Sequence, residues 1–240
     1  MRREVNRMKH KTMWELRQSA TLPDTLELYI YSEVEGDWYD WDGDKHESET
    51  SAAHFREELE KHPNAKEITI YINSLGGSVM EGVAIYNQLK RHSAHKTVYV
   101  DGFACSVASV IAMAGDTVIM PRNTVMMIHN AWTVAVGNAA ELRKAADDLE
   151  VLNAASRQAY LLKAGDKLTE EQLIGMLDRE TYLTAAQCIE LGLADCFADS
   201  DADMKAAEQA LSAKSAEQRL ADEMQLRRQK AVAAINKYFG

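Results

Sequence analysis

The feature that most constrains the fold is an alternation of strands and helices between residues 68 and 128. A β-branched and aromatic run at 68–73 ends in a turn and is followed by a helical segment at 79–92. A second strand at 96–101 leads into a helix of small residues, and two short strands surround Pro121. Strands that alternate with helices across short turns are typical of a parallel sheet covered by helices. The sequence therefore predicts an α/β fold.

Further elements are predicted on both sides of this core. Residues 26–34 alternate apolar and polar residues with the period of a strand, and 51–61 have the pattern of a helix. A long helix is expected over 138–163, because Gly165 stands where a helix C-cap usually lies. The last predicted elements are a helix at 168–177, a strand at 181–184 and a helix that ends at Gly192.

Composition divides the chain into three parts. Residues 1–21 are polar and mixed and are expected to form an N-terminal arm, whereas 22–199 are expected to form one domain. Residues 200–240 lack Pro, lack Gly until the last position, and are rich in Ala, Lys, Glu, Gln and Arg. They predict a charged helical C-terminal tail. The tail is compatible with two interpretations, a solvated helix and a helix that docks on a partner. The second rests on apolar residues that fall near one helical face: Leu220, Met224, Ile235 and Tyr238.

Charge and cysteine content exclude several classes of function. The net charge of −10 argues against nucleic acid as a partner, because phosphate repels an acidic surface. Three cysteines without a CxxC pair predict neither a disulfide framework nor a zinc site. No run approaches the roughly 18 apolar residues of a membrane span, and the basic N-terminus has no apolar segment behind it. A cytoplasmic protein without a membrane partner is expected.

An acidic and aromatic segment at 35–47, EGDWYDWDGDKHE, is predicted to form the tip of a hairpin. Asp40, Asp42 and Asp44 raise the alternative of a calcium loop. Gly43 is misplaced for an EF-hand, however, and no Glu follows at the closing position. We therefore predict no metal site here.

Three features carry potential chemistry. In the turn at 73–78, two glycines permit positive φ and a close approach of other backbone groups. Ser106 stands where a strand turns into a helix, so it could cap the helix or act as a nucleophile with the amide of Val107 near the oxyanion. His129 follows an apolar strand and could be structural or a general base. None of these residues is decisive alone.

Together, four segments resemble the Clp protease proteolytic subunit family, in particular its phage and prophage branch of head maturation proteases. The resemblance covers residues 26–197. The segments are INSLGGSVMEGVAIYNQL, VDGFACSVASVIAMAGD, VMMIHNAW and TYLTAAQCIELGLAD.

The resemblance implies a crotonase-like fold of stacked β-β-α units with one long projecting helix. It implies a serine endopeptidase with Ser106, rather than Ser109, as nucleophile and His129 as base. It implies oxyanion donors at the amides of Gly77 and Val107, and no cofactor or metal. The implied partners are other copies of the chain, a protein substrate such as a capsid or scaffold precursor, and an ATPase unfoldase. The implied location is the bacterial host cytoplasm or the assembling phage head.

The sequence departs from the family pattern in three places, one of which is that residues beyond 200 have no counterpart in the family core. Leu75 stands where many members have Pro. The family aspartate aligns with Glu180, next to the segment TYLT, while Asp178 lies two residues earlier and shares a face on an extended segment. Glu180 is favoured as the third catalytic residue, with Asp178 as the alternative. An ATPase-dependent general protease, an acyl-CoA enzyme on the same fold and a non-catalytic assembly protein are the competing functions.

Overall fold

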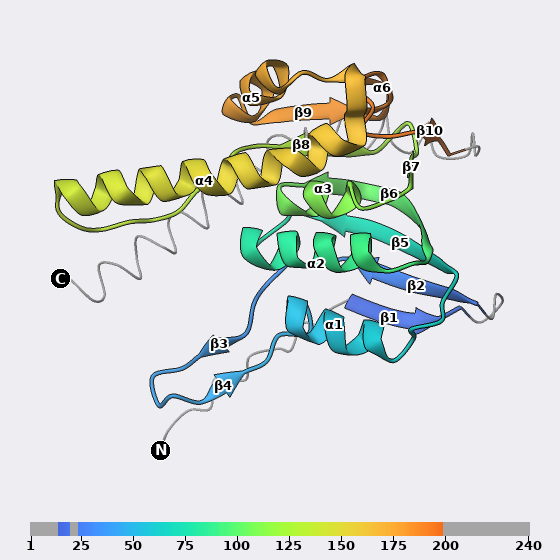
Figure 1. Cartoon of the computed structure of the whole chain (residues 1–240), viewed down its shortest axis with the longest axis horizontal. Coiled ribbons are helices and arrows are strands. Elements are labelled where there is room, and N and C mark those ends of the chain that lie inside the picture. Colours follow the sequence, from blue (N-terminus) through green and yellow to red (C-terminus); the bar gives the residue numbers. More distant parts are fainter. Residues whose placement is uncertain (1–13, 20–23, 199–240) are drawn as a thin grey trace.

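The computed structural model describes residues 14–19 and 24–198 and has an eight-stranded, mostly parallel sheet (Figure 1). The main strand order is β1-β2-β5-β6-β7-β10, and β8 and β9 continue from the far half of β6. The strands are β1 (Trp14–Gln18), β2 (Thr25–Ile30), β5 (Glu67–Ser74), β6 (His95–Cys105), β7 (Thr117–Met120), β8 (Val125–Ile128), β9 (Thr181–Thr184) and β10 (Cys196–Phe197). The mixed α/β prediction is confirmed.

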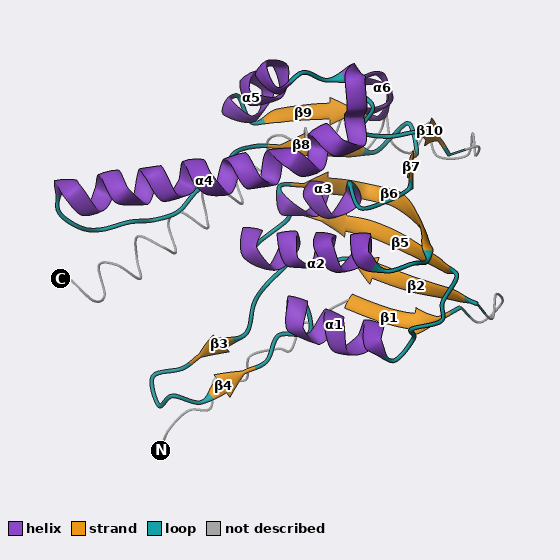
Figure 2. Ribbon diagram, viewed as in Figure 1, coloured by secondary structure: helices purple, strands orange, loops and turns teal. Residues whose placement is uncertain are grey.

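The helices agree with the predicted segments (Figure 2). They are α1 (Ala52–Glu60), α2 (Val79–Arg91), α3 (Val107–Ala112), α4 (Ala139–Ala164), α5 (Glu170–Asp178) and α6 (Ala185–Glu190), with a short 3₁₀ turn at Gly165–Lys167. Gly165 ends α4 with a φ of 58°.

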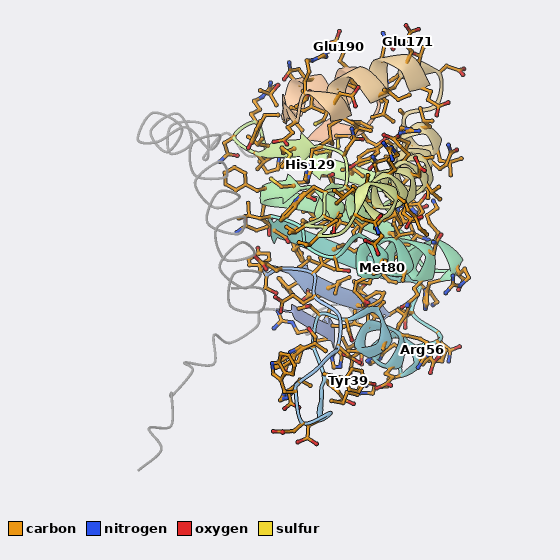
Figure 3. The ribbon with its side chains drawn as sticks, turned by 90° about the vertical axis from the view of Figure 1, so that its left-hand side faces the viewer. Tyr39, Arg56, Met80, His129, Glu171 and Glu190 are labelled. Atoms are coloured by element: carbon orange, nitrogen blue, oxygen red, sulfur yellow. The ribbon has the colours of Figure 1, made fainter. Side chains whose placement is uncertain are left out.

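The core lies between the sheet and the helices on one of its faces (Figure 3). In β5, Ile68, Ile70 and Ile72 are fully buried, whereas Thr69 and Tyr71 on the other face are half-buried. This alternation arises because successive side chains of a strand point to opposite faces. The apolar period therefore fixes which face of the sheet the helices cover.

Strand β6 is longer than the sequence pattern suggested, and this extension shapes the functional end of the sheet. Its first half pairs with β7, and residues 103–105 pair in parallel with β8. The predicted strand at 96–101 therefore continues to Cys105. Because β8 joins the end of β6, the residues that follow these two strands become neighbours.

Part of the segment expected as an arm belongs to the sheet. Residues 14–18 form β1, which pairs antiparallel with β2, and Leu16 packs against the core. Residues 1–13 lie outside the described residues. The tail at 200–240, with its apolar residues, also lies outside them.

The predicted hairpin is present as β3 (Trp38–Tyr39) and β4 (Lys45–His46). The Asp40 carboxylate contacts His46 Nε2 at 2.9 Å and accepts hydrogen bonds from the backbone of Asp42 and Asp44. The hydrogen bond from His46 lowers the pKa of Asp40. Asp40 thus organises the turn through its own side chain. No metal-binding group of three or more His, Cys, Asp or Glu occurs among the residues that the structure describes.

Helix α4 projects from the body of the molecule (Figure 1). A capping box between Asn138 and Glu141 fixes its start. Leu142 and Val151 are largely exposed on it, whereas Tyr160 near its end is buried in the core. Within the described ranges, no helix combines the length and apolar character needed to cross a membrane.

Candidate active site

Three loops with predicted site residues meet at one edge of the sheet. Strand β6 lies between β5 and β8 and runs parallel to both. The carboxyl ends of parallel strands lie at the same edge, where α/β folds commonly bind ligands. The turn at 73–78 follows β5, Ser106 follows β6 and His129 follows β8. The sheet therefore brings together segments that are about 25 residues apart in the chain.

Ser106 does not act as a side-chain cap for α3. Its backbone has a φ of 53°, its N–H donates to Met127 O at 2.8 Å, and its side chain makes no capping hydrogen bond. Instead, Oγ lies 2.7 Å from Nε2 of His129. A positive φ at a residue other than glycine costs about 1–3 kcal/mol and is typical of functional sites. Of the two open interpretations, the geometry favours the nucleophile.

The second serine of this segment has a supporting role. Ser109 is buried, and its hydroxyl donates to Ser106 O at 2.5 Å and lies 2.7 Å from the Tyr160 hydroxyl. Burial raises the pKa of Tyr160, so its phenol stays protonated. These contacts tie the start of α3 to α4.

The glycine turn packs directly against Ser106. Gly76 has a φ of 100°, and a Cβ there would lie 2.6 Å from Ser106 Cβ. Gly77 has a φ of 144°, and a Cβ there would lie 2.2 Å from Val34 O. Val34 N donates to Gly76 O, and Ser78 N donates to Val34 O. Both positions need glycine, because a side chain would collide with backbone or with the serine.

Two backbone N–H groups flank Ser106. Val107 is the first residue of α3, and the first N–H groups of a helix have no partner within it. In the turn, Gly76 N donates to Ser74 Oγ and Ser78 N to Val34 O. The N–H of Gly77 has no such acceptor within the described residues. Both predicted oxyanion donors are therefore available for a ligand.

The two candidate carboxylates lie where α5 leads into β9. Asp178 is the last residue of α5, and its Oδ1 accepts a hydrogen bond from Asn130 Nδ2 at 2.8 Å. Glu180 is exposed and has a φ of 50°. Strand β9 pairs antiparallel with β8, and Thr181 lies opposite Ile128. Position 180 directly precedes β9 and position 129 directly follows β8, so both lie at the same end of this antiparallel pair.

Comparison with known proteins agrees with this arrangement. The family profile named Clp protease matches residues 47–201. The chain belongs to the Clp protease family. A similar protein is the ATP-dependent Clp protease proteolytic subunit of Ligilactobacillus salivarius (strain UCC118). It is 34% identical over 140 residues, which are 57% of this chain and 70% of that protein.

Membership of the Clp protease family makes the chain a serine-type protease. It also decides against an acyl-CoA enzyme on the same fold. In this Clp protease, Ser106 and His129 lie in the segments that the sequence had already indicated as the candidate site.

A pocket beside Ser106 was not predicted from the sequence of this Clp protease. The pocket is narrow, with a volume of about 20 Å³, and it extends from Ser106 and His129 towards α4. Helix α4 contributes polar residues at positions i, i+3 and i+4, a spacing that places them on one helical face. This spacing of polar residues along one helical face was the sequence signal that could have predicted the pocket. The α4 residues in the lining are Asn153, Ser156, Arg157 and Tyr160.

Proposed function

We propose that this Clp protease is an endopeptidase that cleaves peptide bonds through an acyl-enzyme on Ser106. The observation that carries the proposal is the 2.7 Å contact between Ser106 Oγ and His129 Nε2. In this reaction, Oγ attacks the scissile carbonyl carbon while His129 takes the hydroxyl proton. His129 then donates that proton to the leaving amine. A water molecule, activated by the same imidazole, hydrolyses the ester and restores Ser106.

The oxyanion of the tetrahedral intermediate is assigned to the N–H groups of Gly77 and Val107. The close contact between Gly76 and Ser106 supports this assignment, because it fixes the turn against the nucleophile. Preorganised backbone donors of this kind typically contribute a factor of about 10²–10³ to turnover each.

Glu180 is proposed as the residue that orients His129, with Asp178 as the alternative. The strand register favours Glu180, since β8 and β9 lead positions 129 and 180 towards each other. Glu180 and Ser106 are also the two described non-glycine residues with positive φ. Such strain is typical of functional sites. Asp178 already accepts a hydrogen bond from Asn130.

The proposed substrate is a capsid or scaffold precursor processed during phage head maturation. Its support is the resemblance of the four motif segments to the phage branch, which also implies a crotonase-like arrangement of the units. The second candidate is an ATPase-dependent general protease, favoured by the name of the relative from Ligilactobacillus salivarius. In either role we propose a homo-oligomer, because Leu142 and Val151 expose apolar surface on the projecting α4.

A Ser106→Ala variant tests the nucleophile. It should lose reaction with a fluorophosphonate probe and about 10⁶-fold in turnover of an unfolded protein substrate. Ser93→Ala, at an exposed position before β6, is the matched control and should react like the unaltered protein. Mass mapping of the labelled peptide identifies the residue. Labelling at a serine other than Ser106 would overturn the assignment. Incubation with a phage capsid precursor, with and without an ATPase, then separates the two candidate roles.

A further inference from the structure

The narrow pocket beside Ser106 is lined by both apolar and polar side chains. Val79, Val107 and Leu177 belong to the apolar part of the lining. The pocket also contains Ser106 and His129 themselves. In the proposed reaction, the substrate residue that supplies the scissile carbonyl lies against these two side chains. Its own side chain is therefore the group best placed to enter this pocket.

Two buried groups lining the pocket lack hydrogen-bond partners within the described residues. They are the hydroxyl of Ser156 and the Nε of Arg157. The side chain of Arg157 is 13% exposed and forms an ion pair with the exposed Glu170, but the 3.6 Å between Nε and Oε1 is longer than a hydrogen bond. A buried donor without an acceptor costs about 1–3 kcal/mol. Such groups are rare in folded proteins, so the pocket is suited to a ligand that supplies acceptors.

Two other polar residues of the pocket already have hydrogen-bond partners elsewhere, so they do not satisfy Ser156 and Arg157. Asn153 Oδ1 accepts a hydrogen bond from Ala131 N at 2.7 Å. The Tyr160 hydroxyl is paired with Ser109. On the α4 face, the hydroxyl of Ser156 and the Nε of Arg157 are therefore the groups that lack a hydrogen bond. The guanidinium also carries a permanent positive charge, which the solvent-exposed Glu170 offsets in part.

We propose that Ser156 and Arg157 select substrates with a short acidic side chain, aspartate above all, on the acyl side of the scissile bond. This inference rests on the proposed peptidase function. A carboxylate accepts from both the guanidinium and the hydroxyl, and hydrogen bonds between charged groups are about twice as strong as neutral ones. The volume of about 20 Å³ has room for about one water-sized group, so the pocket admits only the end of a side chain, and the short side chain of aspartate fits this limit better than that of glutamate. Asparagine is accepted less well, and leucine leaves both donors unpaired.

The test uses peptides that differ at this one residue, which is Asp, Asn, Leu or Lys. The measured quantity is kcat/KM for each peptide with the full chain. Asp should exceed Leu by about 10- to 100-fold, since hydrogen bonds to charged groups contribute this much. In Arg157→Met the ratio of Asp to Leu should fall to one or below. Arg143→Met is the matched control, because Arg143 lies exposed on the same helix away from the pocket. It should retain the ratio of the unaltered protein.

Fluorophosphonate labelling of Ser106 separates failure of this inference from failure of the proposed function. A chain that labels at Ser106 but prefers Leu to Asp contradicts the pocket assignment and leaves the peptidase intact. A chain that neither labels nor cleaves any peptide overturns both. Ser156→Ala provides a milder variant if Arg157→Met does not fold, and it should lower the Asp to Leu ratio severalfold. An unchanged ratio in Ser156→Ala and in a folded Arg157→Met would refute the proposal.

Discussion

Replacing Gly76 by alanine should damage the site without altering any group that takes part in the reaction. The new Cβ would lie 2.6 Å from Ser106 Cβ and 2.8 Å from Cys105 O. The first of these distances is about 0.8 Å short of ordinary contact, which begins at 3.4 Å. Neither neighbour is the end of a flexible side chain, so the turn and the serine must move apart.

The size of this movement sets the expected loss. A shift of about 0.8 Å away from His129 would stretch the 2.7 Å contact between Ser106 Oγ and Nε2 to about 3.5 Å, outside hydrogen-bond range. Misplacement by about 1 Å can cost 10²-fold in rate. We therefore expect the rate of fluorophosphonate labelling to fall about 100-fold in Gly76→Ala. The positive φ adds about 1–3 kcal/mol of destabilisation.

A matched control isolates the contact from the backbone strain. Gly43 has a φ of 84°, and a Cβ there would meet no atom within 4 Å. Gly43→Ala should therefore lose stability by about 1 kcal/mol but label at the rate of the unaltered protein. Urea denaturation measures the first effect and time-resolved mass spectrometry the second. If folded Gly76→Ala labels as fast as Gly43→Ala, the packing of the turn does not position Ser106, and the argument fails.

Two further predictions concern carboxylates. Glu180→Gln should reduce turnover about 10⁴-fold, as expected for loss of the residue that orients the base. This loss should be larger than that caused by Asp178→Asn. The reverse order in peptide assays would assign the role to Asp178. Asp116 is the pH-dependent case: burial alone would raise its pKa, but hydrogen bonds from the backbone and ammonium groups of Lys96 lower it overall. The stabilising effect of Asp116 is thus complete above the ordinary carboxyl pKa and is lost as pH falls through the lowered pKa of the folded protein. Asp116→Asn should therefore make the free energy of unfolding less dependent on pH between about pH 5 and 2. Urea denaturation across that range checks this, and equal slopes for the two proteins would contradict it.

The sequence pattern was sufficient for features that depend on local periodicity. The alternation in β5 predicts a strand with one buried face, and Gly165 predicts the end of α4. The role of Ser106 could not be decided locally, because a helix cap and a nucleophile both need a strand-to-helix junction. Its contact with His129, 23 residues away, depends on the parallel pairing of β6 and β8.

Other features could not be predicted from the local sequence, because they also depend on contacts between distant segments. Residues 14–18 were expected as part of an arm, since the alternation of one short segment carries little information without its partner β2. The pocket donors at Ser156 and Arg157 come from a helix whose sequence separates apolar and polar residues only weakly. Its inward face becomes evident once α4 is seen against α3 and α5. Long-range packing, rather than propensity, decides such features.

The backbone bridge between Val34 and Gly77 has a consequence for the smallest unit that can retain a working site. Every proposed catalytic side chain lies at position 106 or later, so a fragment that begins at β5 would still contain all of them. Such a fragment would lack Val34, whose N–H and carbonyl hold the turn from both sides. The turn would then be free to sample other conformations, as its two glycines allow. A working site therefore needs residues before β5, because a backbone support for the glycine turn lies well ahead of the residues that are proposed to react.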